Sequence, residues 1–279
     1  MVYKNSIIII LTLFRLFSLN VCDMLYDEHM AKEAVLLSQA SYCSNSLDFN
    51  SFQNNSQIYH VIEKEGEKAL LGYNEEYNSI FVSFRGSTNI QNWLKNIQIE
   101  KISPYEQFQE IAVEEGFYKA YKILDSDIYD KIKDISLKYN VNNLFITGHS
   151  LGAALATLLA FDIVSNNKYN KFNITSLITF GSPRVGNQQF VDLFNSHYIN
   201  SFRITHYYDI APHVPQEFIG YVHISREIWY NEDNSIYKIC NDIDNNEDSK
   251  CSNSCAPTKC TSTKDHLNYL NISIGSGDC

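Results

Sequence analysis

The chain has 279 residues, of which 44% are hydrophobic and 19% are charged, a composition typical of a folded globular protein. Its formal net charge of −10, with 22 basic and 32 acidic side chains and no basic run, argues against nucleic-acid binding and against attachment to an anionic membrane by charge alone. The length suits one large α/β domain with a sizeable core.

The N-terminal segment has the pattern of a secretory signal peptide. Lys4 precedes an apolar run over 7–13, and a second apolar run covers 16–21. Runs this short suit the hydrophobic region of a signal peptide better than a membrane span, although a buried first helix is the alternative. We therefore expect a signal peptide over 1–22, one mature domain over 23–279, and secretion to the outside or to a secretory or lysosomal compartment.

Helical and strand-like patterns alternate along the rest of the chain. We expect helices over 23–42, 115–139 and 151–164, and strands over 58–62, 69–73, 79–84, 143–147, 176–180 and 202–208. Strands that alternate with helices predict a mostly parallel central sheet with helices on both faces, in a single α/β domain.

Residues 231–264 depart from this alternation. They are rich in Asn, Asp, Ser, Lys and Cys, which predicts a surface loop stapled by disulfides. The cysteines here lack the paired CxxC spacing of zinc sites, and the acidic run at 242–246 lacks the glycine and the final glutamate of a calcium loop. We therefore expect no metal ion and no other cofactor.

The cysteine count also favours disulfides. Of the seven cysteines, Cys22 would leave with the signal peptide, and the even number that remains suits an oxidising compartment. Three sequons, at Asn54, Asn173 and Asn271, are compatible with a secreted glycoprotein. The six expected disulfide cysteines are Cys43, Cys240, Cys251, Cys255, Cys260 and Cys279.

The run Gly148-His149-Ser150-Leu151-Gly152 has the form of a nucleophile elbow. An expected strand leads into it and an expected helix leads out. The sharp turn between them requires glycine where a side chain would strike neighbouring backbone, and it exposes the serine hydroxyl near the helix N-terminus. Ser150 is therefore the candidate nucleophile, whereas the structural alternative is a glycine-flanked turn with an idle serine.

A serine nucleophile requires a histidine base and a carboxylate, which follow it in the order acid then histidine in α/β-hydrolases. Asp209 is the candidate acid because it follows the strand expected over 202–208, and active sites of such sheets lie at the carboxyl ends of strands. Asp162 lies in the nucleophile's own helix, and Asp192 lies in an expected surface helix.

His266 is the candidate base because it lies far downstream, on the loop after the cysteine cluster, where it is free to approach the nucleophile. His223 falls in an apparent strand and suits a core or hydrogen-bonded role better. The others precede the nucleophile, adjoin it, lie too close to Asp209 or fall in an expected helix; these are His29, His60, His149, His197, His206 and His213.

Eight motifs, in the same order along the chain, resemble those of the fungal-type class 3 lipase family, secreted α/β-hydrolases that include triacylglycerol lipases and feruloyl esterases. Besides the elbow they are Phe84-Arg85-Gly86-Ser87, Asn92-Trp93, Gly116-Phe117, the run 179–186, Asp209-Ile210-Ala211-Pro212, Glu227-Ile228-Trp229-Tyr230 and Asp265-His266-Leu267. The resemblance implies the α/β-hydrolase fold.

The resemblance assigns Ser150, Asp209 and His266 as a catalytic triad, the same residues that the order along the chain selects. It further implies that the oxyanion is held by the backbone N–H of Leu151 and by Ser87. Such donors each contribute about 3–4 kcal/mol in the transition state.

The resemblance also makes the segment from residue 88 to about residue 96 a lid. Ile90, Trp93 and Leu94 lie close to helical spacing, so a short amphipathic helix would cover the pocket and swing out at an oil surface. The alternative is that these apolar side chains simply pack into the core.

The family pattern further implies that Cys43 pairs with Cys279 and that the other four cysteines pair locally. Two positions depart from the pattern. Glu114 stands where family members usually carry a histidine, and Ala211 stands where valine is common. Glu114 bears on the surroundings of the oxyanion loop.

The implied reaction is hydrolysis of carboxylic esters of lipids through an acyl-enzyme, by a monomer at an oil–water or membrane interface. Triacylglycerol or diacylglycerol is the first substrate expectation, phospholipid cleaved as by a phospholipase A1 the second, and a feruloyl or other carbohydrate ester the third. The rival from another class is a secreted lipid-binding protein on an inactive lipase scaffold, which would not need all three triad groups.

Overall fold

The computed structural model describes residues 25–47, 55–97, 99–242, 247–256 and 258–275. The expected signal peptide lies outside this part of the chain. Within it, no helix is long and apolar enough to cross a membrane.

The centre of the molecule is a sheet of eight strands in the order β1-β2-β3-β6-β7-β8-β9-β10. The five strands from β3 to β9 run parallel, and antiparallel strands complete both ends of the sheet. The strands are β1 (Ser56–Lys64), β2 (Glu67–Asn74), β3 (Ser79–Phe84), β6 (Asn143–His149), β7 (Asn173–Phe180), β8 (Ser201–His206), β9 (Glu227–Tyr230) and β10 (Tyr237–Ile239). The predicted mostly parallel sheet is confirmed.

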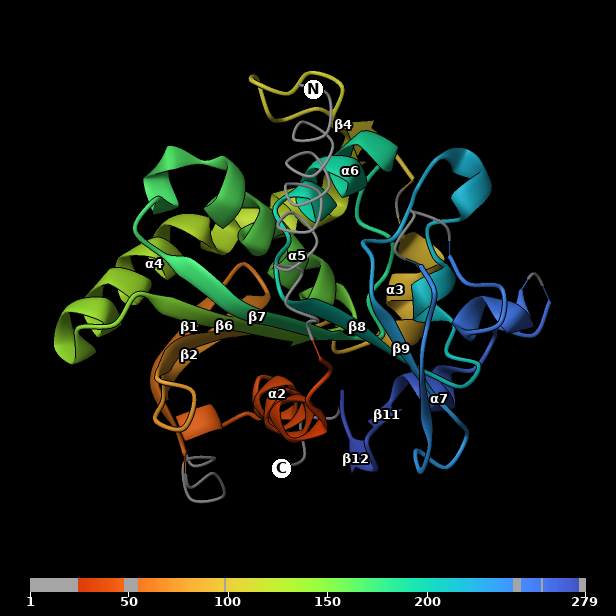
Figure 1. Ribbon diagram of the computed structural model, residues 1–279, viewed down its shortest axis with the longest axis horizontal. Coiled ribbons are helices and arrows are strands. Elements are labelled where there is room, and N and C mark those ends of the chain that lie inside the picture. The colour runs from red at the N-terminus through yellow and green to blue at the C-terminus, as the bar shows by residue number, and fades with distance from the viewer. Residues whose placement is uncertain (1–24, 48–54, 98, 243–246, 257, 276–279) are drawn as a thin grey trace, which may run out of the picture.

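Helices cover both faces of this sheet (Figure 1). Helix α2 packs on one face, and helices α4 and α5 pack on the other. The helices are α2 (Glu28–Ala40), α3 (Ile90–Asn96), α4 (Glu115–Tyr139), α5 (Leu151–Ser165), α6 (Gln188–Ser196) and α7 (Thr263–His266). Each face has its own apolar core, the larger one lying under α4 and α5.

Local sequence explains where the helices begin and end. Helix α2 begins at Glu28 rather than at residue 23, because the Asp27 carboxylate accepts hydrogen bonds from the first free N–H groups and so caps it. Helix α4 spans the expected 115–139. Asn140 caps its C-terminal end in a left-handed backbone conformation, which asparagine tolerates well. Every residue of α5 from Gly152 to Ile163 is buried, which its alanines and leucines permit.

The segment 231–264 is more firmly attached than the predicted surface loop. It contributes β10 to the sheet, and its four cysteines form the disulfides Cys240–Cys251 and Cys255–Cys260. The expected pairing of Cys43 with Cys279 involves a residue outside the described part of the chain, although Cys43 is itself disulfide-bonded.

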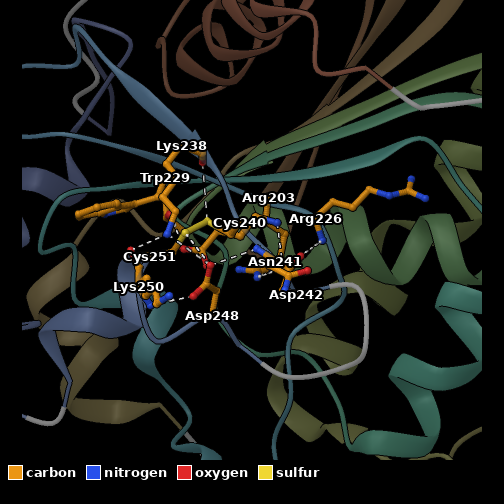
Figure 2. Close-up of a disulfide and its surroundings, with 12 residues drawn as sticks. Arg203, Arg226, Trp229, Lys238, Cys240, Asn241, Asp242, Asp248, Lys250 and Cys251 are labelled. Carbon is orange, nitrogen blue, oxygen red and sulfur yellow. Dashed lines mark hydrogen bonds and ion pairs between the residues drawn. A yellow bond between two sulfur atoms is a disulfide. The ribbon is translucent and has the colours of Figure 1, made fainter.

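Buried ion pairs also anchor this segment. Figure 2 shows Asp242 directed at Arg203 of β8, beside the Cys240–Cys251 disulfide. The Asp242 carboxylate accepts from Arg203 at 3.2 Å and from the backbone N–H groups of Arg226 and Glu227. A second buried pair joins Arg184 to Glu247 at 2.6 Å.

Two short ribbons and several single turns complete the fold. The two-stranded ribbons are β4 (Lys101–Ile102) with β5 (Val113–Glu114), and β11 (Asn268–Tyr269) with β12 (Ile272–Ser273). Single 3-10 turns are η2 (Asn167–Tyr169), η3 (Ala211–His213), η4 (Glu217–Ile219) and η5 (Ser252–Cys255).

Candidate active site

Ser150 lies at the turn between β6 and α5, with φ 60° and ψ −129°. Such a backbone is strained for a residue with a side chain, and strain of this kind gathers at functional sites. A Cβ added at Gly148 would lie 2.3 Å from the carbonyl oxygen of Gly152, and one at Gly152 would lie 2.3 Å from that of Phe84. The turn therefore needs both glycines, as the motif predicted.

Asp209 and His266 lie in direct contact although 57 residues separate them. Nδ1 of His266 lies 3.0 Å and 2.9 Å from the two carboxylate oxygens of Asp209. Both side chains are buried, with 0% and 1% of their surface exposed. Since a carboxylate accepts, Nδ1 of the neutral ring carries the proton and Nε2 keeps a free lone pair.

The chain after the cysteine cluster is held against Asp209 by a short parallel bridge to Ser262. The N–H of Ser262 donates to the carbonyl of Tyr208 at 3.0 Å, and the N–H of Ile210 donates to the carbonyl of Ser262 at 3.3 Å. The hydroxyl of Ser262 also caps α7 by accepting from the N–H of Asp265. This capped turn ends at His266, so the bridge brings the ring to the carboxylate.

Further hydrogen bonds fix the Asp209 carboxylate. The N–H of Ala211 donates to it at 2.7 Å, and the buried hydroxyl of Tyr269 donates to its other oxygen. Burial alone would raise the pKa of Asp209, but the His266 ring and these donors hold the pKa below its usual value. The acid is therefore ionised at neutral pH.

The hydroxyl oxygen of Ser150 and Nε2 of His266 are both buried, and neither has a hydrogen-bond partner within the described chain. The His266 ring lies 4.5 Å from the ring of His149, the residue that precedes Ser150. A Cβ at Gly181 would lie 2.8 Å from Asp209 and 2.9 Å from His266, so the end of β7 also approaches this centre closely. A buried polar group without a hydrogen-bond partner costs free energy of folding, and a catalytic role is one reason for a protein to keep such a group.

The loop after β3 adjoins the elbow. A Cβ at Gly86 would lie 2.9 Å from the Cβ of Ser150, which places Ser87 beside the candidate nucleophile. The half-buried hydroxyl of Ser87 takes part in a turn with Asn89, at 3.3 Å. Leu151 is the first residue of α5, where backbone N–H groups have no partner within the helix. Both groups expected to hold the oxyanion thus lie next to Ser150.

Helix α3 occupies the segment expected to be the lid. Asn89 caps it by accepting from the N–H of Asn92. None of its side chains is buried, and Ile90, Trp93 and Leu94 are half-exposed. Trp93 packs against the main core and stacks on Phe117 with ring centroids 6.3 Å apart, so the alternative of core packing holds only in part.

A cavity of about 190 Å³ lies between α3 and the start of α5. Trp93, Ile97, Phe117 and Leu151 supply apolar walls, and Glu114 adds a carboxyl group. Glu114 is 1% exposed and caps α4 by accepting from the N–H of Phe117. Burial raises the pKa of Glu114 to about 7, although the backbone N–H groups of Phe117 and Gly116 act to lower it.

Other histidines have structural partners. His223 is not in a strand as expected: its Nε2 bonds to the carbonyl oxygen of Pro212 at 2.7 Å. The rings of His206 and His149 likewise bond to backbone carbonyls, those of Asp265 and His266.

Two neighbours of the centre, Tyr42 and Tyr269, escaped the sequence analysis, and a third, Gly181, lay in the motif run 179–186 without a role assigned to it. The glycine follows an expected strand end, which was an available signal. The two tyrosines lie in segments with no pattern that distinguishes them from core aromatics.

Comparison with known proteins identifies the family. Residues 81–219 match the profile described as Lipase (class 3). A lipase of Rhizomucor miehei is 32% identical over 74% of this chain and 56% of its own length. The solved structure of Rhizomucor miehei triacylglyceride lipase superimposes with a TM-score of 0.79 and 27% identity, over 90% of this chain and 97% of that one. The chain belongs to the class 3 lipase family.

The α/β-hydrolase fold of class 3 lipases is therefore the fold of this chain. Phospholipase A1-II 1 of Oryza sativa subsp. indica is 30% identical over 67% of this chain and 51% of its own length. The chain spans about half the length of the curated relatives it matches.

Proposed function

We propose that this class 3 lipase is a secreted, monomeric serine hydrolase that cleaves carboxylic esters of lipids, with triacylglycerol or diacylglycerol as its substrate. The observation that carries the proposal is the buried His266–Asp209 pair beside the strained elbow at Ser150. The expected secretion is supported by the two disulfides of the described chain, since disulfides persist in oxidising compartments.

The geometry supports acyl transfer to water. Nε2 of His266 takes the proton of Ser150 as the hydroxyl oxygen attacks the ester carbonyl, while Asp209 holds the ring tautomer and stabilises the imidazolium. The backbone N–H of Leu151 donates a hydrogen bond to the oxyanion, and Ser87 supplies a second donor. The alcohol leaves with the proton from His266, and water then releases the acid by the same steps.

Lipid esters are favoured as substrates by the apolar part of the cavity wall, which includes Trp93, Phe117 and Leu151, and by the half-exposed α3. The Rhizomucor miehei relatives are named lipase and triacylglyceride lipase. A phospholipid substrate is the second candidate, because one relative is named a phospholipase A1. No comparable observation favours a feruloyl ester or a purely lipid-binding role.

A fluorophosphonate probe tests the reaction class, because it phosphonylates an activated serine. We expect labelling of the protein and its complete loss in Ser150→Ala. Ser176→Ala is the matched control, because Ser176 is also buried with an unpartnered hydroxyl but lies within β7. A folded parent that stays unlabelled, or labelling that survives in Ser150→Ala, would refute the hydrolase proposal.

Initial rates on three esters then decide the substrate. Triolein emulsion, phosphatidylcholine vesicles and methyl ferulate are compared at equal enzyme concentration. We expect the highest rate on triolein, and on tributyrin a rise in rate above the solubility limit if α3 opens at an oil surface. A higher rate on phosphatidylcholine would instead assign the second candidate.

A further inference from the structure

The buried ring of His149 contacts the backbone of the proposed base. Nε2 of His149 lies 2.8 Å from the carbonyl oxygen of His266, and the two ring centroids are 4.5 Å apart. Because a carbonyl oxygen only accepts hydrogen bonds, Nε2 of His149 must carry a proton and donate it. The carbonyl group of His266 is thereby held from the elbow.

The other ring nitrogen of His149 contacts a third residue, Tyr42. Nδ1 lies 2.8 Å from the hydroxyl oxygen of Tyr42, which is itself buried. Burial, and then the neighbouring His266, lower the pKa of His149 to about 3, so the ring is neutral near pH 7. A neutral ring protonated at Nε2 has a bare Nδ1, so the Tyr42 hydroxyl donates to it.

The hydrogen bonds therefore run in one direction, from Tyr42 to His149 to the carbonyl of His266. They join three separate elements, since Tyr42 follows α2, His149 ends β6 and His266 ends α7. Asp209 fixes the ring of His266, whereas His149 fixes its backbone. A general base must be held within a fraction of an ångström to take a proton in the transition state.

We propose that Tyr42 and His149 are positioning residues that hold His266 in its reactive place. This inference rests on the proposed function, because it assigns a purpose to the His266 backbone only if His266 is the base. Both side chains are buried and bond to groups of the protein. Their contribution travels through the His149 donor, so Tyr42 acts only while His149 is present.

If Tyr42 and His149 had only a structural role, we would expect different results. Loss of either residue would then lower the free energy of unfolding but leave the turnover of the remaining folded enzyme unchanged. Tyr42 also abuts the oxyanion loop, because a Cβ at Gly86 would lie 2.3 Å from its hydroxyl. An effect through that loop would persist without His149, so a double-mutant cycle separates the routes.

The experiment measures kcat, KM and the rate of fluorophosphonate labelling for Tyr42→Phe, His149→Phe and the double variant, with unfolding followed by circular dichroism. We expect kcat to fall about fivefold in Tyr42→Phe and about tenfold or more in His149→Phe, with KM unchanged. The double variant should lose no more than His149→Phe alone. His149→Gln should recover most of the kcat, because its amide N–H can replace the lost donor.

Tyr169→Phe is the matched control. The Tyr169 hydroxyl is buried and donates to Asp125 at 2.7 Å, joining η2 to α4. It should lose stability but keep its kcat. A kcat within twofold of the parent in both Tyr42→Phe and His149→Phe, losses that multiply in the double variant, or an effect confined to KM would overturn the inference. A parent protein that the probe does not label would remove the proposed function and the inference together.

Discussion

Asp209 illustrates how much one residue of the proposed triad depends on its neighbours. Its two carboxylate oxygens receive donors from His266, Ala211 and Tyr269. Each donor favours the ionised form and so opposes the desolvation that burial imposes. Tyr269 is the member that the sequence motifs did not include, and its hydroxyl can be removed without a change in shape.

Tyr269→Phe should therefore weaken catalysis at low pH most. Without this donor the charge of the Asp209 carboxylate is less neutralised and acts more strongly on the ring of His266, which favours the protonated, inactive ring. The acid limb of the kcat/KM profile, which reports protonation of the base, therefore moves to higher pH, and activity at pH 7 should fall about three- to tenfold. The profile is measured from pH 4 to pH 9. Tyr73→Phe, which removes a hydroxyl bonded to Asn78 far from the site, is the control. An unshifted acid limb would contradict this role.

Glu114 gives a prediction for stability. Its pKa is raised from the ordinary 4.5 to about 7, so between these values the folded protein holds a proton that the unfolded chain releases. Stability from this group is thus full below pH 4.5 and lost as pH rises through 7. Glu114→Gln keeps an acceptor for the N–H of Phe117 and cannot ionise.

We therefore expect Glu114→Gln to gain stability relative to the parent by about 2 kcal/mol at pH 8, and to gain none at pH 4. Urea unfolding at the two pH values measures the difference. Glu106→Gln, at an exposed position, should show no such pH dependence. An equal effect of Glu114→Gln at both pH values would contradict the raised pKa.

At the scale of elements, the segment after β9 carries His266 but has little apolar content of its own. Its attachment depends on two disulfides and on buried ion pairs, among them Asp242 with Arg203 (Figure 2). Removing one partner of a buried pair leaves the other charge without compensation, which costs about 3–5 kcal/mol. The segment therefore couples the edge of the sheet to the position of α7.

Asp242→Ala should accordingly lower the free energy of unfolding by about 3 kcal/mol and reduce kcat, because the segment that bridges to Asp209 through Ser262 loses part of its support. Chemical unfolding and ester hydrolysis are measured on the same preparation. Asp130→Ala, which removes an exposed acid on α4, serves as the comparison. If Asp242→Ala and Asp130→Ala had the same free energy of unfolding, the ion pair would not contribute to stability.

At the scale of the whole molecule, the predicted bond between Cys43 and Cys279 would tie the end of α2 to the end of the chain. Cys43 follows α2, and α2 packs on the face of the sheet opposite α4 and α5. A bond that closes so long a loop stabilises by about 5–6 kcal/mol in the chain-entropy model. A non-reducing tryptic map should contain the peptide of Cys43 joined to that of Cys279, and Cys43→Ser should lower the Tm. A map that joins Cys43 to another cysteine would refute the pairing.

Local sequence was sufficient for most of the elements and for the elbow. Helix α4 and strand β3 have the expected bounds, and β6 and α5 extend the expected ranges by only one or two residues. These segments are long or strongly apolar, so their periodicity is a strong signal. The failures arose where tertiary contacts replaced local preference, as in the segment 231–264 and at His223.

The sequence by itself determined the family motifs, the strand–turn–helix around Ser150 and the order of acid and base along the chain, because each depends on residues that are neighbours or on a fixed order. Only the tertiary structure decided which side chains meet. The contact of Asp209 with His266, the donor from Tyr269 and the link from Tyr42 through His149 all join residues far apart in the chain. Such contacts follow from how the elements pack on the sheet, and no local pattern encodes that packing.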